Sequence, residues 1–346
     1  MLTKIYYISF VLISTYLFSY PIHSADLNGL KIVFGSCLHQ DKPSPILAQI
    51  TREKPDYFFL LGDTIYLDSL EPEEKRVAYQ KQFQNIQFRQ LTKQTKIRAI
   101  WDDHDYGIND SGGEYEKKFE SRNLFLEFFG KLQPKHIQPG TKNEEGIFFS
   151  EEVLWKGKRI QFIFLDTRYF RSPLRRSFWS YFSGKKQYVA DDSKDKSMLG
   201  DEQWEWLSSE MKKKVDFRIL VSGIQVISQT QPFEKWENFS AERIRLLNLI
   251  QTNNPQNTIL ISGDRHIAEI YQYPMTGDFK LTEVTSSSLN LPLPFLSLDY
   301  DSEFKLGEGY PDVNYGVLEI DFKDGVLNWN ASIRSLEGKK VMDVSK

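Results

Sequence analysis

Residues 57–66 read YFFLLGDTIY, in which an apolar run is followed at once by Gly62 and Asp63. A short apolar run that ends at a turn residue is typical of a buried β-strand. The same arrangement, an apolar run with polar residues directly behind it, recurs along the chain. The further predicted strands are Leu30–Phe34, Ile97–Trp101, Ile160–Leu165, Phe217–Val221 and Thr258–Ile261.

Longer amphipathic stretches lie between these strands and predict helices. The predicted helices are Ile46–Glu53, Glu73–Thr95, Glu114–Leu132, Asp201–Lys214 and Ala241–Thr252. Strands that alternate with helices predict an α/β layered domain. The C-terminal part differs, because short strands follow one another there with glycine-containing turns, which favours antiparallel pairing. These strands are predicted at Ile267–Tyr273, Phe279–Val284, Tyr315–Asp321 and Val326–Ile333.

The composition excludes several classes of protein. The 346 residues are 40% hydrophobic and 14% aromatic, which supplies a packed core and excludes disorder for most of the chain. The 44 Lys and Arg against 47 Asp and Glu give a net charge of −3, so we expect no nucleic-acid binding. The single cysteine, Cys37, excludes an intrachain disulfide. No internal repeat or Ser/Gly linker divides the sequence, so we expect one catalytic domain over residues 26–346.

The N-terminus combines Lys4 with the uncharged run Ile5–Tyr20 and the small residues Ser24 and Ala25. This order is typical of a secretory signal peptide, so we predict a signal peptide over residues 1–25 and a secreted or periplasmic protein. The alternative is an uncleaved N-terminal membrane anchor, because the run is nearly long enough to span a bilayer. No second apolar segment of that length follows, so we expect no stable membrane insertion of the mature chain.

Polar residues that can bind metal ions follow the predicted strands directly. In an open α/β sheet the loops beyond the carboxyl ends of the strands meet in one crevice. Carboxylates gathered there repel one another unless a metal ion binds them. Taken singly, each residue has a structural alternative: a thiol that packs, a carboxylate that caps a helix, or a phenol that covers the core edge. The residues are Cys37, Asp63, Tyr66, Asp102, Asp103, His104, Asp264 and His266.

Motifs of two other enzyme classes do not occur in the sequence. A G-x-S-x-G elbow is missing, so the hydroxyl run at residues 285–288 has no serine-hydrolase context. No Gly-Lys pair is followed by Ser or Thr, which excludes a P-loop NTPase.

Four motifs resemble the signatures of one family. They are GDTIY (62–66), WDDHDYGIND (101–110), LDTR (165–168) and SGDRH (262–266). In these motifs the sequence is similar to alkaline phosphatase D, the PhoD-like metallophosphatases of the calcineurin-like metallophosphoesterase superfamily. The resemblance implies a layered α/β/β/α sandwich with two mixed β-sheets. It also implies a metal-dependent phosphoric ester hydrolase, either a phosphodiesterase or a phosphomonoesterase.

The resemblance also implies a role for each site residue. Asp63 would bridge two metal ions, and His104 would be the catalytic imidazole near the leaving group. Cys37 and Tyr66 would bind ferric iron, Fe(3+), with calcium, Ca(2+), beside it, and other divalent cations are the alternative. Phenolate and carboxylate oxygens suit iron and calcium ions. The remaining implied ligands are Asp103, Asp264 and His266.

One feature departs from the family pattern. PhoD-like enzymes are commonly exported with a twin-arginine signal, which allows metal to be loaded in the cytoplasm. Residues 1–25 contain no arginine, so Sec-type export is expected here and the assignment of iron is weaker.

The implied reaction is hydrolysis of a phosphate ester by attack of metal-bound hydroxide. His104 would protonate the leaving oxygen. Arg168 would hold a non-bridging phosphoryl oxygen or, alternatively, pair with a neighbouring carboxylate. The substrate would be an ester of a phospholipid, a polymer or a nucleotide, classes that the motifs do not separate. The rival hypothesis is a catalytically inactive secreted binding protein that keeps the fold, and such a protein should have lost some of the ligands.

Residues Arg171–Met198 mix basic, aromatic and acidic clusters without periodicity. A loop of this length is usually functional or disordered. We predict a lid that selects the substrate, with a disordered surface insertion as the alternative.

Overall fold

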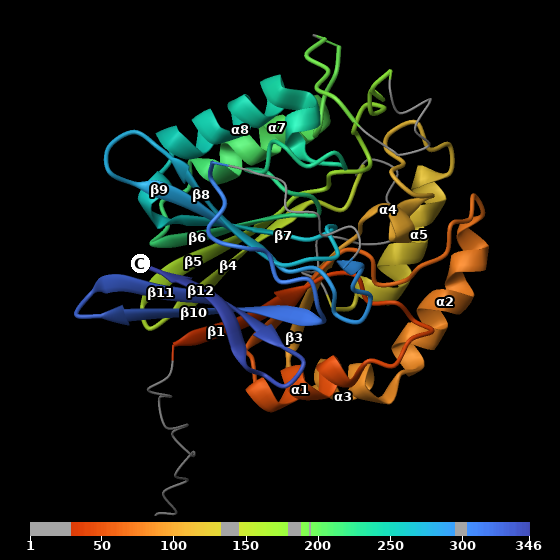
Figure 1. Ribbon diagram of the computed structural model, residues 1–346, viewed down its shortest axis with the longest axis horizontal. Helices are drawn as coiled ribbons and strands as arrows, with labels where there is room; N and C mark the ends of the chain where they lie inside the picture. The colour runs from red at the N-terminus through yellow and green to blue at the C-terminus, as the bar shows by residue number, and fades with distance from the viewer. Residues whose placement is uncertain (1–28, 133–144, 179–187, 194, 295–302) are drawn as a thin grey trace, which may run out of the picture.

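Two six-stranded β-sheets pack face to face, with helices on their outer faces (Figure 1). The computed structural model describes residues 29–132, 145–178, 188–193, 195–294 and 303–346. The predicted layered sandwich with two mixed sheets is confirmed. The predicted signal peptide, residues 1–25, lies outside the described residues. Within the described ranges, no helix is both long and apolar enough to cross a membrane.

The first sheet has the strand order β12-β11-β10-β1-β2-β3. Its parallel half consists of three strands predicted from apolar runs: β1 (Leu30–Gly35), β2 (Tyr57–Leu61) and β3 (Lys96–Ile100). Its antiparallel half consists of β10 (Asn314–Lys323), β11 (Val326–Ser335) and β12 (Lys340–Ser345). The helices that connect the parallel strands are α1 (Pro45–Glu53), α2 (Pro72–Gln84) and α3 (Ile86–Gln94).

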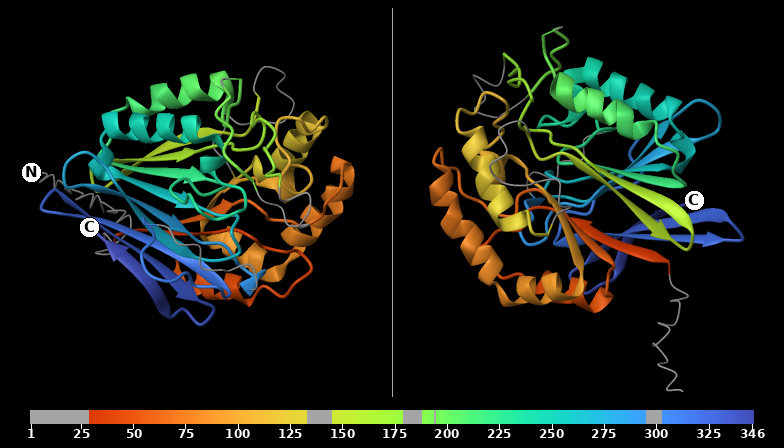
Figure 2. Two further views of the ribbon diagram at one scale, coloured as in Figure 1. Left: turned by 45° about the horizontal axis from the view of Figure 1, so that its top comes forward. Right: turned by 180° about the vertical axis from the view of Figure 1, so that it is seen from behind.

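The second sheet has the order β4-β5-β6-β7-β9-β8. Its central strands are parallel and consist of β5 (Lys158–Phe164), β6 (Phe217–Ser222), β7 (Thr258–Ser262) and β9 (Lys280–Thr285). The edges, β4 (Phe149–Trp155) and β8 (Glu269–Pro274), run antiparallel. The helices α7 (Gly200–Met211) and α8 (Ser240–Thr252) cover its outer face, whereas α1 and α3 lie on the opposite side of the sandwich, as Figure 2 shows from two directions. Short 3-10 turns occur at η1 (Trp236–Phe239) and η2 (Pro255–Asn257).

Aromatic side chains join the two sheets. Phe59 on β2 of the first sheet packs edge-on against Phe162 and Phe164 on β5 of the second, with ring centroids 5.1 and 4.9 Å apart. Tyr57 makes a similar contact with Phe162 at 5.1 Å. Edge-to-face rings add about 0.5–1.5 kcal/mol per pair to the stabilisation from buried area. These aromatic contacts therefore fix the position of one sheet, and of its strand ends, relative to the other.

The structure differs from the sequence prediction at several elements. The single helix predicted over Glu73–Thr95 is two helices, because the backbone breaks at Asn85, whose side chain accepts a hydrogen bond from the Phe88 N–H and caps α3. The prediction of antiparallel pairing is correct for β10 with β11 and for β8 with β9, but β9 also pairs parallel with β7. The edge strands β4 and β12 were not predicted, because charged and exposed residues interrupt their apolar pattern. The predicted helix over Glu114–Leu132 is the shorter α5 (Lys118–Phe129), preceded by a single turn, α4 (Asp103–Tyr106).

Candidate metal centre

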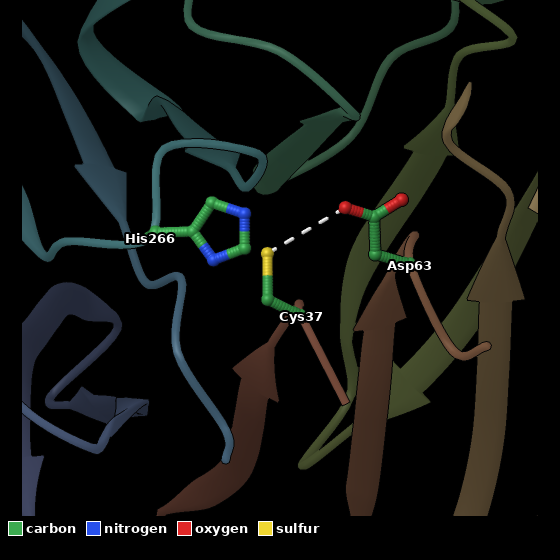
Figure 3. A group of neighbouring side chains, drawn as sticks. All are labelled: Cys37, Asp63 and His266. Atoms are coloured by element: carbon green, nitrogen blue, oxygen red, sulfur yellow. Dashed lines mark hydrogen bonds between the residues drawn. The ribbon is translucent and has the colours of Figure 1, made fainter. Parts of the chain in front are cut away.

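Loops at the carboxyl ends of β1, β2 and β7 bring three predicted ligands together. Cys37 follows β1, Asp63 follows β2 and His266 follows β7, and their side chains point toward one another (Figure 3). The Cys37 sulfur lies 3.6 Å from Asp63 Oδ2. One ligand atom from each of the three residues lies within 4.8 Å of the other two, which is close enough for one metal ion to contact all three. This group supplies a thiolate, a carboxylate and an imidazole.

Further ligand groups lie beside the first, and one of them shares Asp63 with it. Asp63 also groups with Asp103 and His104, and Asp103 also groups with Asp102 and Asp264. The neighbouring groups therefore meet at Asp63 and Asp103, as expected if carboxylates lie between adjacent ions. Tyr66 lies in the same cluster, because its hydroxyl donates a hydrogen bond to Asp63 Oδ2 at 3.0 Å. All six predicted ligands thus gather in one region; they are Cys37, Asp63, Tyr66, Asp103, Asp264 and His266.

The backbone is strained where it carries these ligands. Cys37, Asp63, Asp264 and His266 adopt φ angles of 60°, 53°, 71° and 55°, in the left-handed region that non-glycine residues rarely occupy. Such strain costs about 1–3 kcal/mol per residue and clusters at functional sites. Gly62 allows the close approach of two of these loops, since a Cβ atom there would lie 2.4 Å from the Asp102 Cβ. The strained backbone therefore lowers the stability of the fold, but it directs these four side chains toward the same cluster.

The charges of the centre are unbalanced without a cation. Burial raises the pKa of Asp63 well above its usual value, and the charge of Asp103 raises it further. Burial likewise raises the pKa of Asp264 well above its usual value, and the charge of Asp102 adds to the increase. Among the described residues, the buried Oδ1 atom of Asp63 has no hydrogen-bond partner. A buried carboxylate oxygen without a partner is costly, and a metal ion would satisfy it.

The hydrogen bonds of His266 and Cys37 also fit metal binding. His266 Nδ1 lies 2.6 Å from the Leu291 carbonyl oxygen, which only accepts, so Nδ1 carries the proton and the lone pair of Nε2 is left for a ligand. Burial raises the pKa of the Cys37 thiol to about 11, and hydrogen bonds to Ser287, Tyr66 and Ser36 oppose this rise. A bound cation would deprotonate the thiol outright. The donor set present therefore fits a metal centre.

His104 lies at the edge of the centre, and its side chain is 15% exposed. Its Nδ1 lies 2.9 Å from Asp68 Oδ1, and its ring centroid lies 4.4 Å from that of Tyr66. Burial disfavours the protonated ring, but the charges of Asp103 and Asp63 and the hydrogen bond to Asp68 outweigh it and raise the pKa of His104 to about 10. The buried ammonium of Lys75 donates to the carbonyls of His104 and Gly107 and holds the turn that carries the ring.

Arg168 is fully buried between two carboxylates. Its Nε donates to Asp102 Oδ1 at 2.6 Å, and its Nη1 lies 2.6 Å from Glu234 Oε2. Arg171 also pairs with Glu234, at 3.1 Å. Of the two roles considered from the sequence, the structure shows Arg168 in the ion pair. Its remaining Nη2 lies 4.0 Å from Asp103 Oδ1, beside a predicted ligand.

Several residues of the site were not singled out from the sequence. Ser287 lies between two ligands, 3.0 Å from the Cys37 sulfur, and its oxygen accepts the His266 N–H at 2.7 Å. Ser287 also pairs with Ser36 in an isolated parallel bridge that connects the two sheets at the site. The sequence feature that could have indicated Ser287 is the run of hydroxyl residues at 285–288, which directly follows a predicted strand. Asp68, Lys75 and Glu234 had no signal, because their roles depend on partners distant in the sequence.

The segment Arg171–Met198 is described only in part, since residues 179–187 and 194 lie outside the described residues. On its described side, the Tyr188 hydroxyl donates to Asp110 Oδ2 at 2.6 Å. The Asp110 N–H in turn donates to Asp103 Oδ2 at 2.6 Å. The base of the segment is thus connected to a predicted ligand, and its role as a substrate-selecting lid stays a prediction.

A family model and several solved structures are similar to this chain. A family model described as PhoD-like phosphatase matches residues 32–300. A solved structure of PhoD is 15% identical, with a TM-score of 0.68 over 93% of this chain and 69% of that chain. A solved structure of GAP50, described as the anchor in the inner membrane complex of Plasmodium, is 14% identical, with a TM-score of 0.57 over 92% of this chain and 88% of that chain. A search of curated proteins found no match.

Proposed function

The chain belongs to the PhoD-like phosphatase family, and from that premise we propose that it is a secreted, metal-dependent phosphoesterase. The family makes it a phosphoesterase, and the metal dependence, the activity and the export are the parts proposed. The fold alone does not carry the proposal, because a phosphatase and a protein described as an anchor share it. What carries it is the gathering of six ligand residues, two of them shared between adjacent groups.

The ligands divide into two sets by their chemistry. Cys37, Tyr66 and His266 offer sulfur, phenol and imidazole donors, which suit Fe(3+), whereas the carboxylates of Asp103 and Asp264 suit Ca(2+) or another divalent cation. Asp63 lies between the two sets. Bound cations would supply an acidified water and neutralise the phosphoryl charge. The protein's own contribution is to hold four of the donors at strained backbone positions before the substrate arrives, namely Cys37, Asp63, Asp264 and His266.

His104 is placed to act on the leaving group. Asp68 holds its Nδ1, which leaves Nε2 for the oxygen of the departing alcohol. Lys75 donates to two carbonyl oxygens of the same turn and so supports the backbone that carries the ring. Arg168 acts indirectly, because it holds Asp102 in the adjoining ligand group. We therefore assign His104 a catalytic role and Arg168 a positioning role, and we retain a phosphate ester as the substrate.

Metal analysis coupled to hydrolysis tests the proposal. Purified protein should contain metal and hydrolyse bis-p-nitrophenyl phosphate or p-nitrophenyl phosphate, a chelator should abolish this activity, and added iron and calcium should restore it. The exposed carboxylate of Asp41, which pairs with Lys81, offers a matched control, so Asp41→Asn should retain metal and activity. Full activity in metal-stripped protein would refute metal dependence. Metal-replete protein that hydrolyses neither ester would favour the inactive binding protein.

Export is proposed from residues 1–25, as a Sec-type signal peptide, with an N-terminal anchor as the alternative. N-terminal sequencing of protein recovered from the medium or periplasm should begin near residue 26. A protein that retains residue 1 and sediments with membranes would support the anchor.

A further inference from the structure

Among the described residues, two buried cations beside the metal centre form no ion pair with a carboxylate. Arg265 lies between the predicted ligands Asp264 and His266 and is only 6% exposed, and Lys235 is only 4% exposed. Among the described residues, the Nε atom of Arg265 has no hydrogen-bond partner, and its guanidinium instead stacks over the Phe233 ring at 4.8 Å. The Lys235 ammonium donates to the Phe233 carbonyl oxygen at 3.3 Å. Both cations therefore contact Phe233, Arg265 at its ring and Lys235 at its carbonyl oxygen.

The two carboxylates whose charges act on Lys235, Glu234 and Glu237, are already paired with other arginines. Glu234 pairs with Arg168 at 2.6 Å and with Arg171 at 3.1 Å. Glu237 pairs with Arg243 at 3.3 Å. Within the part of the chain that the structure describes, these ion pairs leave Arg265 and Lys235 without a carboxylate of their own. A buried charge without a partner costs several kcal/mol, so such a pair is expected only where a ligand completes it.

The two cations also oppose one another. Burial lowers the pKa of Lys235 to about 8, and although Glu237 and Glu234 oppose this shift, the charge of Arg265 adds to it. Packing two like charges together within a folded core destabilises the protein. An anion bound between them would relieve both the repulsion and the lack of partners.

Several hydrogen bonds hold the loop that carries Phe233 and Lys235. The buried side chain of Gln231 accepts the Phe233 N–H at 2.6 Å and donates to the Glu234 carbonyl oxygen at 2.7 Å. The Lys235 N–H donates to the Asn238 side chain at 2.9 Å. Through Glu234 the loop is tied to Arg168, which holds Asp102 at the metal centre. Lys235 is therefore held in a loop connected to the metal centre, and Arg265 lies beside the same centre between Asp264 and His266.

We propose that Arg265 and Lys235 bind a second anionic group of phosphate chemistry next to the metal centre, in addition to the phosphoryl group under attack. The inference rests on the proposed function and narrows its substrate class to esters that carry another phosphate. The planar fork of Arg265 and the point charge of Lys235 suit phosphate oxygens. Free inorganic phosphate has the same chemistry and is the other source of such a ligand.

Two measurements on the metal-replete protein distinguish these sources. In the first, kcat/KM is compared for the p-nitrophenyl ester of thymidine monophosphate with and without an additional phosphate on the free sugar hydroxyl. Wild-type protein should prefer the phosphorylated ester by about tenfold or more, as expected for a charge-assisted contact. Lys235→Met and Arg265→Met should remove this preference, Lys235→Arg should retain most of it, and the exposed control Lys93→Met should retain all of it. In the second measurement, inorganic phosphate is titrated into the same proteins by calorimetry.

The outcomes separate the inference from the proposed function. A preference that Lys235→Met removes supports a substrate-borne phosphate. No preference, together with phosphate binding that Lys235→Met weakens about tenfold and Lys93→Met does not, assigns the pair to free phosphate. If neither the ratio nor phosphate binding responds to Lys235→Met or Arg265→Met, the inference is wrong. If wild-type protein hydrolyses neither ester, the proposed function fails while the titration still tests the anion site.

Protein stability gives an independent readout. If Lys235 has no carboxylate partner in the free protein, Lys235→Met should unfold at the same or a higher denaturant concentration than wild type, because an apolar side chain suits the buried position better. Marked destabilisation would mean that Lys235 has a structural partner, and it would count against the anion site.

Discussion

The side-chain oxygen of Ser287 lies 3.0 Å from the sulfur of Cys37, although 250 residues separate them in the chain. The same oxygen accepts the backbone N–H of His266, so the hydroxyl proton of Ser287 is free to point at the sulfur. A hydrogen bond donated to sulfur favours the thiolate over the thiol. Ser287 therefore contacts two predicted ligands and is expected to tune the bond from Cys37 to a metal ion.

Ser287→Ala should weaken metal binding by about 10–100-fold, the usual effect of removing a group that orients a ligand. In cobalt-substituted protein, the thiolate-to-metal absorption band should shift, because the sulfur loses its hydrogen bond. Ser287→Thr should keep the band, and so should Ser193→Ala, which alters an exposed serine. An unchanged band and metal affinity in Ser287→Ala would limit Ser287 to its bridge with Ser36.

Cys37→Ser should remove the thiolate-to-iron charge-transfer band expected of iron-loaded protein and leave only absorption from the Tyr66 phenolate, because serine offers no sulfur. The Cys37 thiol should also resist alkylation until metal is removed. Optical spectra and thiol labelling with and without chelator test both statements. Colourless, metal-replete protein with a freely reactive thiol would return Cys37 to a packing role.

Asp63→Asn should lower kcat/KM by about a thousandfold, more than Asp264→Asn, because Asp63 is shared between ligand groups. Metal content measured on the same sample should fall with activity. Asp264→Asn is the matched comparison, since Asp264 belongs to one group only. If both variants lose activity equally, Asp63 does not bridge two ions.

His104→Asn should slow hydrolysis of esters with alkyl leaving groups by about 10²–10⁴-fold. The loss should be much smaller for p-nitrophenyl esters, because p-nitrophenolate leaves without help from an acid. Rates for a series of leaving groups, with metal content held equal, measure this difference. The same loss for every ester would show that His104 does not protonate the leaving oxygen.

Arg168→Met should lower the free energy of unfolding by about 3–5 kcal/mol, because Asp102 and Glu234 would lose their buried counter-ion. Denaturant unfolding measures this change, and Arg89→Met, at an exposed position on α3, should be nearly neutral. A variant of normal stability in which only KM rises would restore the alternative that Arg168 holds a phosphoryl oxygen.

The central strands could be predicted because their pattern is local. Residues such as those of β2 and β7 are buried on both faces, so each strand appears as an unbroken apolar run. The edge strand β4 is half exposed, and its two glutamates interrupt the apolar run by which a strand is recognised in the sequence. The break at Asn85 was missed because an asparagine inside a helical pattern marks a cap only when the backbone turns there.

The sequence by itself determined the candidate ligands, since each follows a strand and parallel strands deliver their carboxyl ends to one edge of a sheet. Only the tertiary structure decided how those ligands are supported. The pairing of Arg168 with Asp102 spans 66 positions, and that of Ser287 with Cys37 spans 250. The absence of an acidic partner for Arg265 and Lys235 among the described residues likewise depends on which carboxylates Arg171 and Arg243 pair with. Electrostatic and hydrogen-bond energies depend on distance through space, and the folded packing of the two sheets sets those distances.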